Sequence, residues 1–288
     1  MSARAILDNP EFRRPGSGGG LLGVFRQRHL LTLLLKKGVA TRYHGSALGW
    51  VWSYIRPAAQ FVMYWLVIEV IMGANKGMNP FPVYLFAGIV AVNLFSEALR
   101  NTTSSIVDNK SLVQKIYLPR ELFPIAAIGV GFVHFLPQAV LLLLVSLLLG
   151  WTIGWVQVLA FVVGIILILM FALGLGLFFG AINVAYRDAK NFVDLILMFA
   201  TWASPVLYSS AMVADRAPNW LYQIYMVNPM TAAVELFHIA FWEPIAQDPI
   251  RPTDTILHTS IALAIAAITF VIGQITFRKL EGSFAQNL

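Results

Sequence analysis

Six long apolar stretches, separated by more polar segments, account for most of this chain. A helix that crosses a lipid bilayer needs roughly 20 predominantly apolar residues, and each stretch approaches or exceeds that length. The stretches are Trp50–Met72, Val83–Leu99, Leu122–Leu149, Val156–Val184, Phe192–Leu207 and Ile256–Phe277. The pattern predicts an all-α integral membrane protein with six transmembrane helices in one domain, residues 49–280.

Composition leads to the same class of protein. Hydrophobic residues make up 58% of the 288-residue chain and charged residues only 12%, whereas a soluble domain usually carries about 25% charged residues. The outer surface must therefore face lipid. The absence of cysteine excludes disulfides, thiolate metal sites and a cysteine nucleophile.

The positive charges indicate how the chain is oriented. Of the 20 Lys and Arg residues, all but Lys76, Arg216 and Arg251 lie on segments that fall on the same side as the N-terminus. Cytoplasmic segments of membrane proteins are enriched in Lys and Arg, so we expect both termini, including residues 281–288, in the cytosol. The formal charge of +6 follows this membrane pattern, so we expect no nucleic-acid partner.

The region before the first span divides into two parts. Residues 1–20 end in a Gly-rich run and are predicted to form a flexible cytosolic tail. Residues 21–48 contain a moderately amphipathic segment, Leu21–Tyr43, that is too polar to span a membrane. We interpret it as a helix lying in the cytosolic headgroup layer; the alternative is a cytosolic helix packed against the bundle.

The outer segment 208–255 is too apolar and too aromatic for a free loop. Asn228-Pro229 is typical of a helix start, with Asn as N-cap and Pro at the first helical position. We expect two short helices that dip into the outer leaflet, Asn219–Met226 and Pro229–Phe241. The alternative is a plain aromatic belt at the membrane interface.

Motifs for catalysis or nucleotide binding are missing from the sequence. It contains no G-x-x-x-x-G-K-[ST] phosphate-binding loop and no H-E-x-x-H, and its five histidines are scattered without ligand spacing. Glu69, Glu97 and Asp194 do not lie clearly at mid-membrane, where an ion-coupled carrier usually buries a carboxylate. We therefore expect no catalytic site, metal site or cofactor on this chain. The energy for transport would come from a partner protein.

Small residues recur at every fourth position of the fourth apolar stretch. Ala172, Gly176 and Gly180 share one face, with Gly174 beside them, and such spacing lets two helices approach closely. The sequence leaves open whether this face packs within one subunit or between subunits.

Two inner loops have the character of docking sites. The first, residues 100–121, mixes apolar and basic residues in a short predicted helix that would present Leu112, Val113 and Ile116 to something other than lipid. The second, residues 185–191, is short and charged. Together they suggest a cytosolic partner.

Five motifs together resemble one family, over about residues 25–285. They are Gly49-Trp50 through Arg56-Pro57, the run from Lys115 to Pro124, Tyr186-Arg187-Asp188, Ser204 through Tyr208, and Asn228-Pro229-Met230. The chain is similar to the membrane (permease) subunit of ABC exporters of lipid-linked polysaccharides, the group serving O-antigen and teichoic acid export. Within that group it most resembles the actinobacterial members for cell-wall galactan, and this substrate rests on likeness alone.

The resemblance implies a homodimer of twelve spans in the bacterial plasma membrane, with two separate ATPase subunits that hold ATP and Mg²⁺. Leu30–Tyr43 would be the interfacial helix, and segment 212–242 would gate the exit. The residues expected to couple to the ATPase are Asn109, Lys110, Leu112, Val113, Lys115, Ile116, Pro119, Arg120, Arg187 and Asp188.

The expected substrate, a polyprenyl diphosphate carrying a long glycan, needs two kinds of contact. Arg42, His44 and Arg56 are the candidates for the diphosphate, because arginine forms bidentate contacts with phosphate. Sugar C–H faces stack on aromatic rings, and the candidates for the glycan channel and gate are Phe61, Tyr64, Trp65, Trp202, Tyr208, Trp220, Tyr222 and Phe237. Two alternatives stay open: an exporter of this architecture for a drug or simple lipid, and a membrane enzyme acting on polyprenyl lipids.

Overall fold

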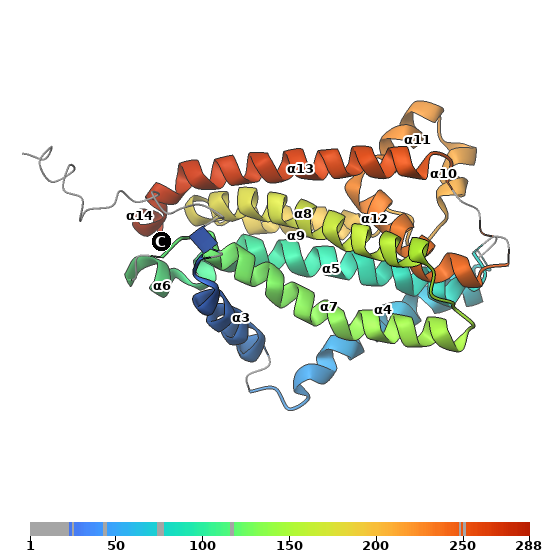
Figure 1. The fold of residues 1–288 in the computed structure, drawn as a ribbon, viewed down its shortest axis with the longest axis horizontal. Helices are drawn as coiled ribbons and strands as arrows, with labels where there is room; N and C mark the ends of the chain where they lie inside the picture. The colour runs from blue at the N-terminus through green and yellow to red at the C-terminus, as the bar shows by residue number, and fades with distance from the viewer. Residues whose placement is uncertain are drawn as a thin grey trace, which may run out of the picture.

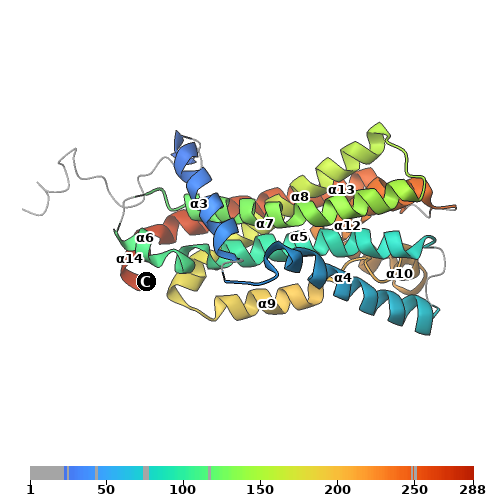
Figure 2. The same cartoon turned by 90° about the horizontal axis from the view of Figure 1, so that it is seen from below.

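A computed structural model describes residues 23–24, 26–42, 45–73, 78–115, 118–247, 249 and 252–288. The described residues form helices, turns and loops, with no β-strand among them. The longer helices run along one bundle axis, and α3 (Arg28–Arg42) crosses that axis steeply near one end (Figures 1 and 2). The other main helices are α4 (Trp52–Trp65), α5 (Phe81–Asp108), α7 (Leu122–Leu148), α8 (Trp155–Ala185), α9 (Ala189–Ala200) and α13 (Thr255–Leu280).

Shorter elements cluster at the two ends. Helix α6 (Lys110–Lys115), the 3-10 turn η5 (Glu281–Ser283) and α14 (Phe284–Asn287) lie at the end that carries the C-terminus (Figure 1). Helices α10 (Ser210–Arg216) and α11 (Asn219–Met226) lie at the opposite end. The remaining elements are η1 (Gly49–Val51), the π-helical η2 (Leu66–Ile71), α12 (Pro229–Phe237), the π-helical η3 (His238–Trp242) and η4 (Glu243–Ile245).

Helix α5 is the central element of the bundle. It begins after Pro80 with Pro82 in its first turn, where the missing N–H of proline is not needed. Nearly four-fifths of its apolar window is buried, because α4, α7, α8, α9 and α12 all pack on it. The predicted span Val83–Leu99 is thus one part of a longer helix.

Among the described residues, five helices are long and apolar enough to cross a membrane: Gly49–Ile71, Phe81–Asp108, Leu122–Leu148, Trp155–Ala185 and Thr255–Asn287. These correspond to the first, second, third, fourth and sixth predicted spans. The bent pair Asn219–Met226 and Pro229–Ile245, with an angle of 72° between its halves, would make a sixth crossing.

The predicted fifth span, Phe192–Leu207, is wrong as a continuous helix. Helix α9 has 12 residues and ends at Ala200, and turns follow from Thr201. Pro205 explains part of this difference, because proline lacks an N–H and disfavours helical geometry at the residue before it.

The outer segment does contain the two predicted short helices, and it adds a third, α10. Asn228 caps α12 by accepting a hydrogen bond from the Met230 N–H, with Pro229 at the first position, as predicted. The predicted helix Pro229–Phe241 continues beyond α12 as the π-helix η3. All nine residues of α12 are buried, so this segment is part of the core.

Glycines allow the closest helix crossings. A Cβ on Gly176 would lie 2.5 Å from Thr102 of α5, and a Cβ on Gly273 of α13 would overlap the carbonyl of Gly174. The face with Ala172, Gly176 and Gly180 therefore packs inside one subunit, which settles the alternative that the sequence left open.

Candidate functional site

Helix α6 is fixed to the rest of the bundle by Asn109. The Asn109 Nδ2 donates to the carbonyl of Ser105 in α5, at 2.9 Å, and its Oδ1 accepts a hydrogen bond from Lys37 Nζ of α3, also at 2.9 Å. Val113 faces inward, in a cluster that includes Phe284 of α14. The position of α6 is thus set by α3, α5 and the C-terminal segment together.

The outward face of α6 is polar and basic. Its exposed residues are Lys110, Ser111, Gln114 and Lys115. Leu112 is half-buried and Val113 is buried in the cluster with Phe284. These two residues were expected to face a partner, but in the structure they mostly pack inward. Ile116 lies outside the described residues.

The second inner loop lies close to the first. Arg187 and Asp188 are exposed in the turn between α8 and α9, and Lys190 is near enough to Asp108, at the end of α5, for their charges to interact. The two loops thus form one surface at the end of the bundle that carries the C-terminus. This exposed set is named here the basic end surface: Lys110, Ser111, Gln114, Lys115, Arg187 and Asp188.

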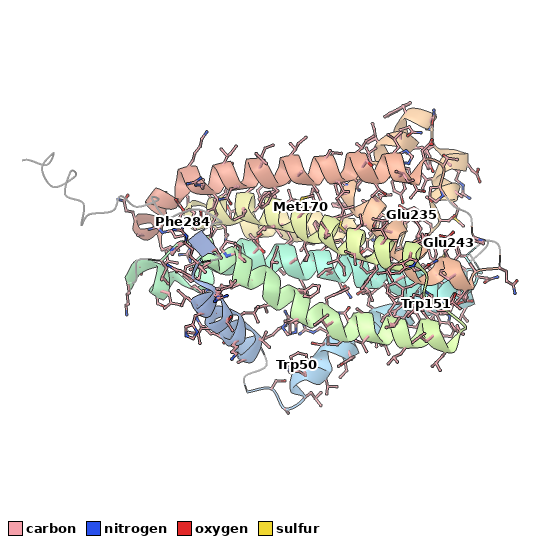
Figure 3. The ribbon with its side chains drawn as sticks, viewed as in Figure 1. Trp50, Trp151, Met170, Glu235, Glu243 and Phe284 are labelled. Atoms are coloured by element: carbon pink, nitrogen blue, oxygen red, sulfur yellow. The ribbon has the colours of Figure 1, made fainter. Side chains whose placement is uncertain are left out.

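Pro119 and Arg120 lie beside this surface and are half-buried. The guanidinium carbon of Arg120 is 5.7 Å from the ring centroid of Phe284, within the range of a cation–π contact. Figure 3 labels Phe284 at this end. Arg120 therefore contacts the C-terminal segment.

Two of the three candidates for the diphosphate share a pocket. Arg42 and Arg56 line a cavity of about 270 Å³ together with Ser46, Trp52 and Ser53, between the end of α3 and the start of α4. His44 lies outside the described residues.

The two arginines differ in their partners. Arg42 forms a bidentate pair with Glu97 of α5, with Nη1–Oε2 at 2.5 Å and Nη2–Oε1 at 2.6 Å. Arg56 is exposed and lies 5.9 Å from the Trp52 ring centroid. Among the described residues no carboxylate lies within ion-pair distance of Arg56. Its guanidinium is therefore available to an anion.

The aromatic candidates on α4 pack toward the bundle. Phe61, Tyr64 and Trp65 contact the core, and Phe61 meets Phe86 of α5 edge to face at 5.7 Å. The exposed residues in the second half of this span are not aromatic and include Met63, which is 63% exposed, whereas Trp50, Trp52 and Tyr54 are exposed near its start.

The candidates nearer the outer end fall into two groups. Trp202 and Trp220 are exposed, at 61% and 65%, and the Tyr208 hydroxyl donates to the Trp202 carbonyl at 2.6 Å. Tyr222 is mostly buried and Phe237 is fully buried, among Phe135, Phe161 and Phe241. Phe237 is thus a core residue, out of reach of a glycan in this structure.

A polar face on α5 was missed by sequence reasoning. Its members are half-buried or exposed: Asn93, Ser96, Glu97, Arg100, Asn101 and Ser104. Arg100 Nε donates to Asp194 of α9 at 3.0 Å, and Asn93 Nδ2 donates to Gln138 of α7 at 3.1 Å. The i, i+4, i+8 spacing of Asn93, Glu97 and Asn101 was the available signal. This polar face contacts α3 through Arg42, α7 through Gln138 and α9 through Asp194.

Comparison with known proteins finds relatives along most or nearly all of the chain. The O-antigen export system permease protein RfbA of Myxococcus xanthus is 28% identical over 265 residues, covering 92% of this chain and 97% of that protein. A protein of the same name from Klebsiella pneumoniae is 26% identical, covering 90% and 95%. The polysialic acid transport protein KpsM of Escherichia coli is 21% identical over 212 residues, covering 73% and 80%.

A family description, ABC-2 type transporter, matches residues 29–242. The matched region runs from the start of α3 to the end of η3, so it contains the basic end surface, the arginine pocket and the polar face of α5. The chain belongs to the ABC-2 type transporter family.

Proposed function

We propose that this chain is the membrane permease subunit of an ATP-driven exporter that moves a lipid-linked polysaccharide from the cytosolic to the outer face of the bacterial plasma membrane. The observation that carries this proposal is the similarity to O-antigen export permeases along at least 90% of the chain. The names of those relatives supply the substrate class, and the geometry supports the subunit's role.

Coupling to an ATPase is supported by the basic end surface. The sequence has no phosphate-binding loop of its own, so ATP and Mg²⁺ would be held by a separate subunit, in two copies. The exposed polar side of α6 would sit in a cleft of that ATPase. Because Asn109 ties α6 to both α3 and α5, a movement of α6 would reach both helices.

A homodimer is supported by the face that α4 and α9 leave uncovered. Only 6% of the apolar window of Gly49–Ile71 is buried, and α9 exposes Phe192 and Phe199. The Arg100–Asp194 pair on the same side is about half exposed. Lipid cannot solvate such charges, so a second copy and a water-filled path would cover them.

The diphosphate of a polyprenyl-linked substrate would bind first at Arg56. Its guanidinium faces the cavity of about 270 Å³ and has no carboxylate partner among the described residues. Arg42 would bind phosphate only in exchange for Glu97. Cell-wall galactan is the proposed glycan, and the exposed rings of Trp202 and Trp220 would contact sugar faces near the exit.

Orientation follows from the basic residues at the C-terminal end of the bundle. Arg278 and Lys279 occupy the last turn of α13, at the same end as the basic end surface (Figure 1). Because cytoplasmic segments of membrane proteins are enriched in Lys and Arg, this end of the bundle and both termini would lie in the cytosol.

Depletion of the chain in its own cells tests the proposed function. We expect the lipid-linked polysaccharide to accumulate on the cytosolic side while the surface polymer disappears, measured by glycan analysis of intact and lysed cells. Unchanged surface polymer, with accumulation of a drug or a simple lipid, would favour the alternative function, an exporter of this architecture for a drug or simple lipid.

A further inference from the structure

A cavity of about 320 Å³ lies between α3, α5 and α7, and the proposed transport function does not use it. It is distinct from the pocket of Arg56, because among the described residues Arg42 alone lines both. Figures 1 and 2 show α3 lying across the bundle near the end that carries the C-terminus, where it packs on α7. Cavities of about 300–1,000 Å³ are the usual size for small-ligand sites.

The helices around this cavity are held in fixed positions. A Cβ on Gly38 of α3 would lie 2.6 Å from a methyl group of Val130 in α7, so these two helices are already as close as they can pack. Lys37 of α3 donates to Asn109 at the end of α5, at 2.9 Å. The cavity is therefore a defined site and not a loose gap that a small helix movement would close.

The depth of the cavity in the membrane corresponds to the layer of lipid headgroups. Helix α5 has 28 residues and is about 42 Å long, close to the thickness of a bilayer with its headgroup layers. The hydrocarbon core accounts for only about 20 residues of such a helix. The cavity touches α5 at Asn101, Ser105, Asp108 and Asn109, which form its last turns. A ligand bound there would lie at headgroup depth.

The cavity carries one positive and one negative charge at its exposed edge. Lys37 and Asp108 both line it and both are exposed. Neither forms an ion pair within the part of the chain that the structure describes, although Lys190 is near enough to Asp108 for their charges to interact. The third charged lining residue, Arg42, is paired with Glu97. This arrangement is complementary to a zwitterion rather than to a simple anion.

The polar wall offers hydrogen-bond acceptors to a ligand. The Thr41 hydroxyl donates to a backbone carbonyl one turn earlier, at 2.7 Å, and Asn101 Nδ2 donates to Glu97 Oε2 at 3.3 Å. With these hydrogens used, Thr41 Oγ1 and Asn101 Oδ1 remain as acceptors beside the carboxylate of Asp108. A primary ammonium group has three N–H donors for such a set, whereas a trimethylammonium group has none.

The other lining groups suit the rest of a phospholipid headgroup. Lys37 Nζ uses one N–H on Asn109 and keeps two for a phosphate. The facing wall is apolar, with Leu34, Phe123 and Ala126 buried, which suits a glycerol backbone and the first methylene groups. Phe123 is the single aromatic residue among the described lining residues, so there is no cage of rings of the kind that binds choline.

We propose that this cavity binds the headgroup of a phosphatidylethanolamine, with the ammonium group at Asp108, Thr41 and Asn101 and the phosphate at Lys37. The bound lipid connects α3 to the end of α5, because each helix supplies one of the two charges. This lipid is a component of the membrane and not the exported substrate. The site is therefore independent of the proposed export function.

Titration of the full purified chain with lipids of identical acyl chains, followed by native mass spectrometry in detergent, tests the site. The lipids are phosphatidylethanolamine, phosphatidylcholine and phosphatidylglycerol. Asp108→Asn removes the negative charge at nearly constant size, and Lys37→Gln removes the positive charge. Lys36→Gln is the matched control, because Lys36 is an exposed lysine of α3 that does not line this cavity.

We expect wild type to bind phosphatidylethanolamine about tenfold more tightly than phosphatidylcholine, because a charge-assisted hydrogen bond is lost with the N–H groups. Asp108→Asn should lose most of this preference. Lys37→Gln should bind both lipids more weakly and keep the preference, because both lipids carry the phosphate. Lys36→Gln should follow wild type, and phosphatidylglycerol should bind wild type more weakly than phosphatidylethanolamine.

Equal affinity of wild type for phosphatidylethanolamine and phosphatidylcholine would overturn the proposal, as would an unchanged preference in Asp108→Asn. Tighter binding of phosphatidylglycerol would show a simple anion site instead. Soluble glycerophosphoethanolamine should displace the bound lipid, and glycerophosphocholine should not. Equal displacement by both, or by neither, would contradict headgroup recognition. These wild-type comparisons decide the question even where a variant does not fold.

Discussion

Two arginines in one pocket show how a partner changes the role of a residue. Arg42 forms a bidentate pair with Glu97, whereas the Arg56 guanidinium lies over the Trp52 ring, 5.9 Å from its centroid. Sequence reasoning grouped these arginines because both lie near the start of the first span. It could not separate them, because Glu97 is 55 residues away from Arg42 along the chain.

Substitution of each arginine should therefore have a different effect. Arg42→Ala leaves Glu97 without its bidentate partner, so we expect the free energy of unfolding to fall by about 1 kcal/mol, a modest value because both groups are partly exposed. Arg56→Ala should keep the wild-type Tm and reduce export. Calorimetry and a transport assay on the same preparations measure the two effects.

The double variant Arg42→Ala/Glu97→Gln serves as the control, because it removes both charges and should recover part of the lost stability. Normal export by Arg56→Ala would exclude this residue as the phosphate ligand. Equal Tm losses for the two alanine variants would contradict the assigned difference in partners.

At the scale of elements, small residues decide how closely the helices approach. Gly174 of α8 and Gly273 of α13 meet backbone to backbone, and Gly176 of α8 meets Thr102 of α5. The sequence showed the small-residue spacing on α8 but not its partner. The partner Gly273 lies about 100 residues later in the chain, so only the folded chain reveals the crossing.

Gly273→Ala should destabilise the α8–α13 crossing. The added methyl group overlaps the Gly174 carbonyl, so the helices must separate, and we expect a loss of about 1–3 kcal/mol, measured by thermal or denaturant unfolding in detergent. Gly282→Ala is the control, because nothing lies within 4 Å of its added Cβ. A Gly273→Ala chain as stable as Gly282→Ala would contradict close packing at this point.

At the scale of the whole molecule, hydrophobic runs predicted the membrane class and five of the six spans. The exception was the region after α9, where a run of apolar residues continues past Ala200 although the helix stops. Apolar composition alone cannot distinguish a spanning helix from buried turns. The burial of α12 in the core was also not predicted, because the apolar composition of the outer segment indicated only that it leaves the solvent, and not that Glu235 and Phe237 would join the core.

The site was predictable to the extent that it consists of short local motifs. The α6 segment and the turn with Arg187 and Asp188 were identified from neighbouring residues in the sequence, and the structure places both loops on one surface. The pairings Arg42–Glu97 and Arg100–Asp194 join distant helices. A single sequence contains no signal for such contacts.

Native mass spectrometry of the tagged chain tests most directly whether it works as a dimer driven by a separate ATPase, as we propose. Purified from its own membranes in mild detergent, the chain should appear as two copies with two copies of an ATPase that carries a phosphate-binding loop. Lys110→Glu/Lys115→Glu, which reverses the exposed charge of α6, should lose the ATPase, and Arg216→Glu at the opposite end should retain it. A lone chain without an ATPase in several detergents would contradict the account.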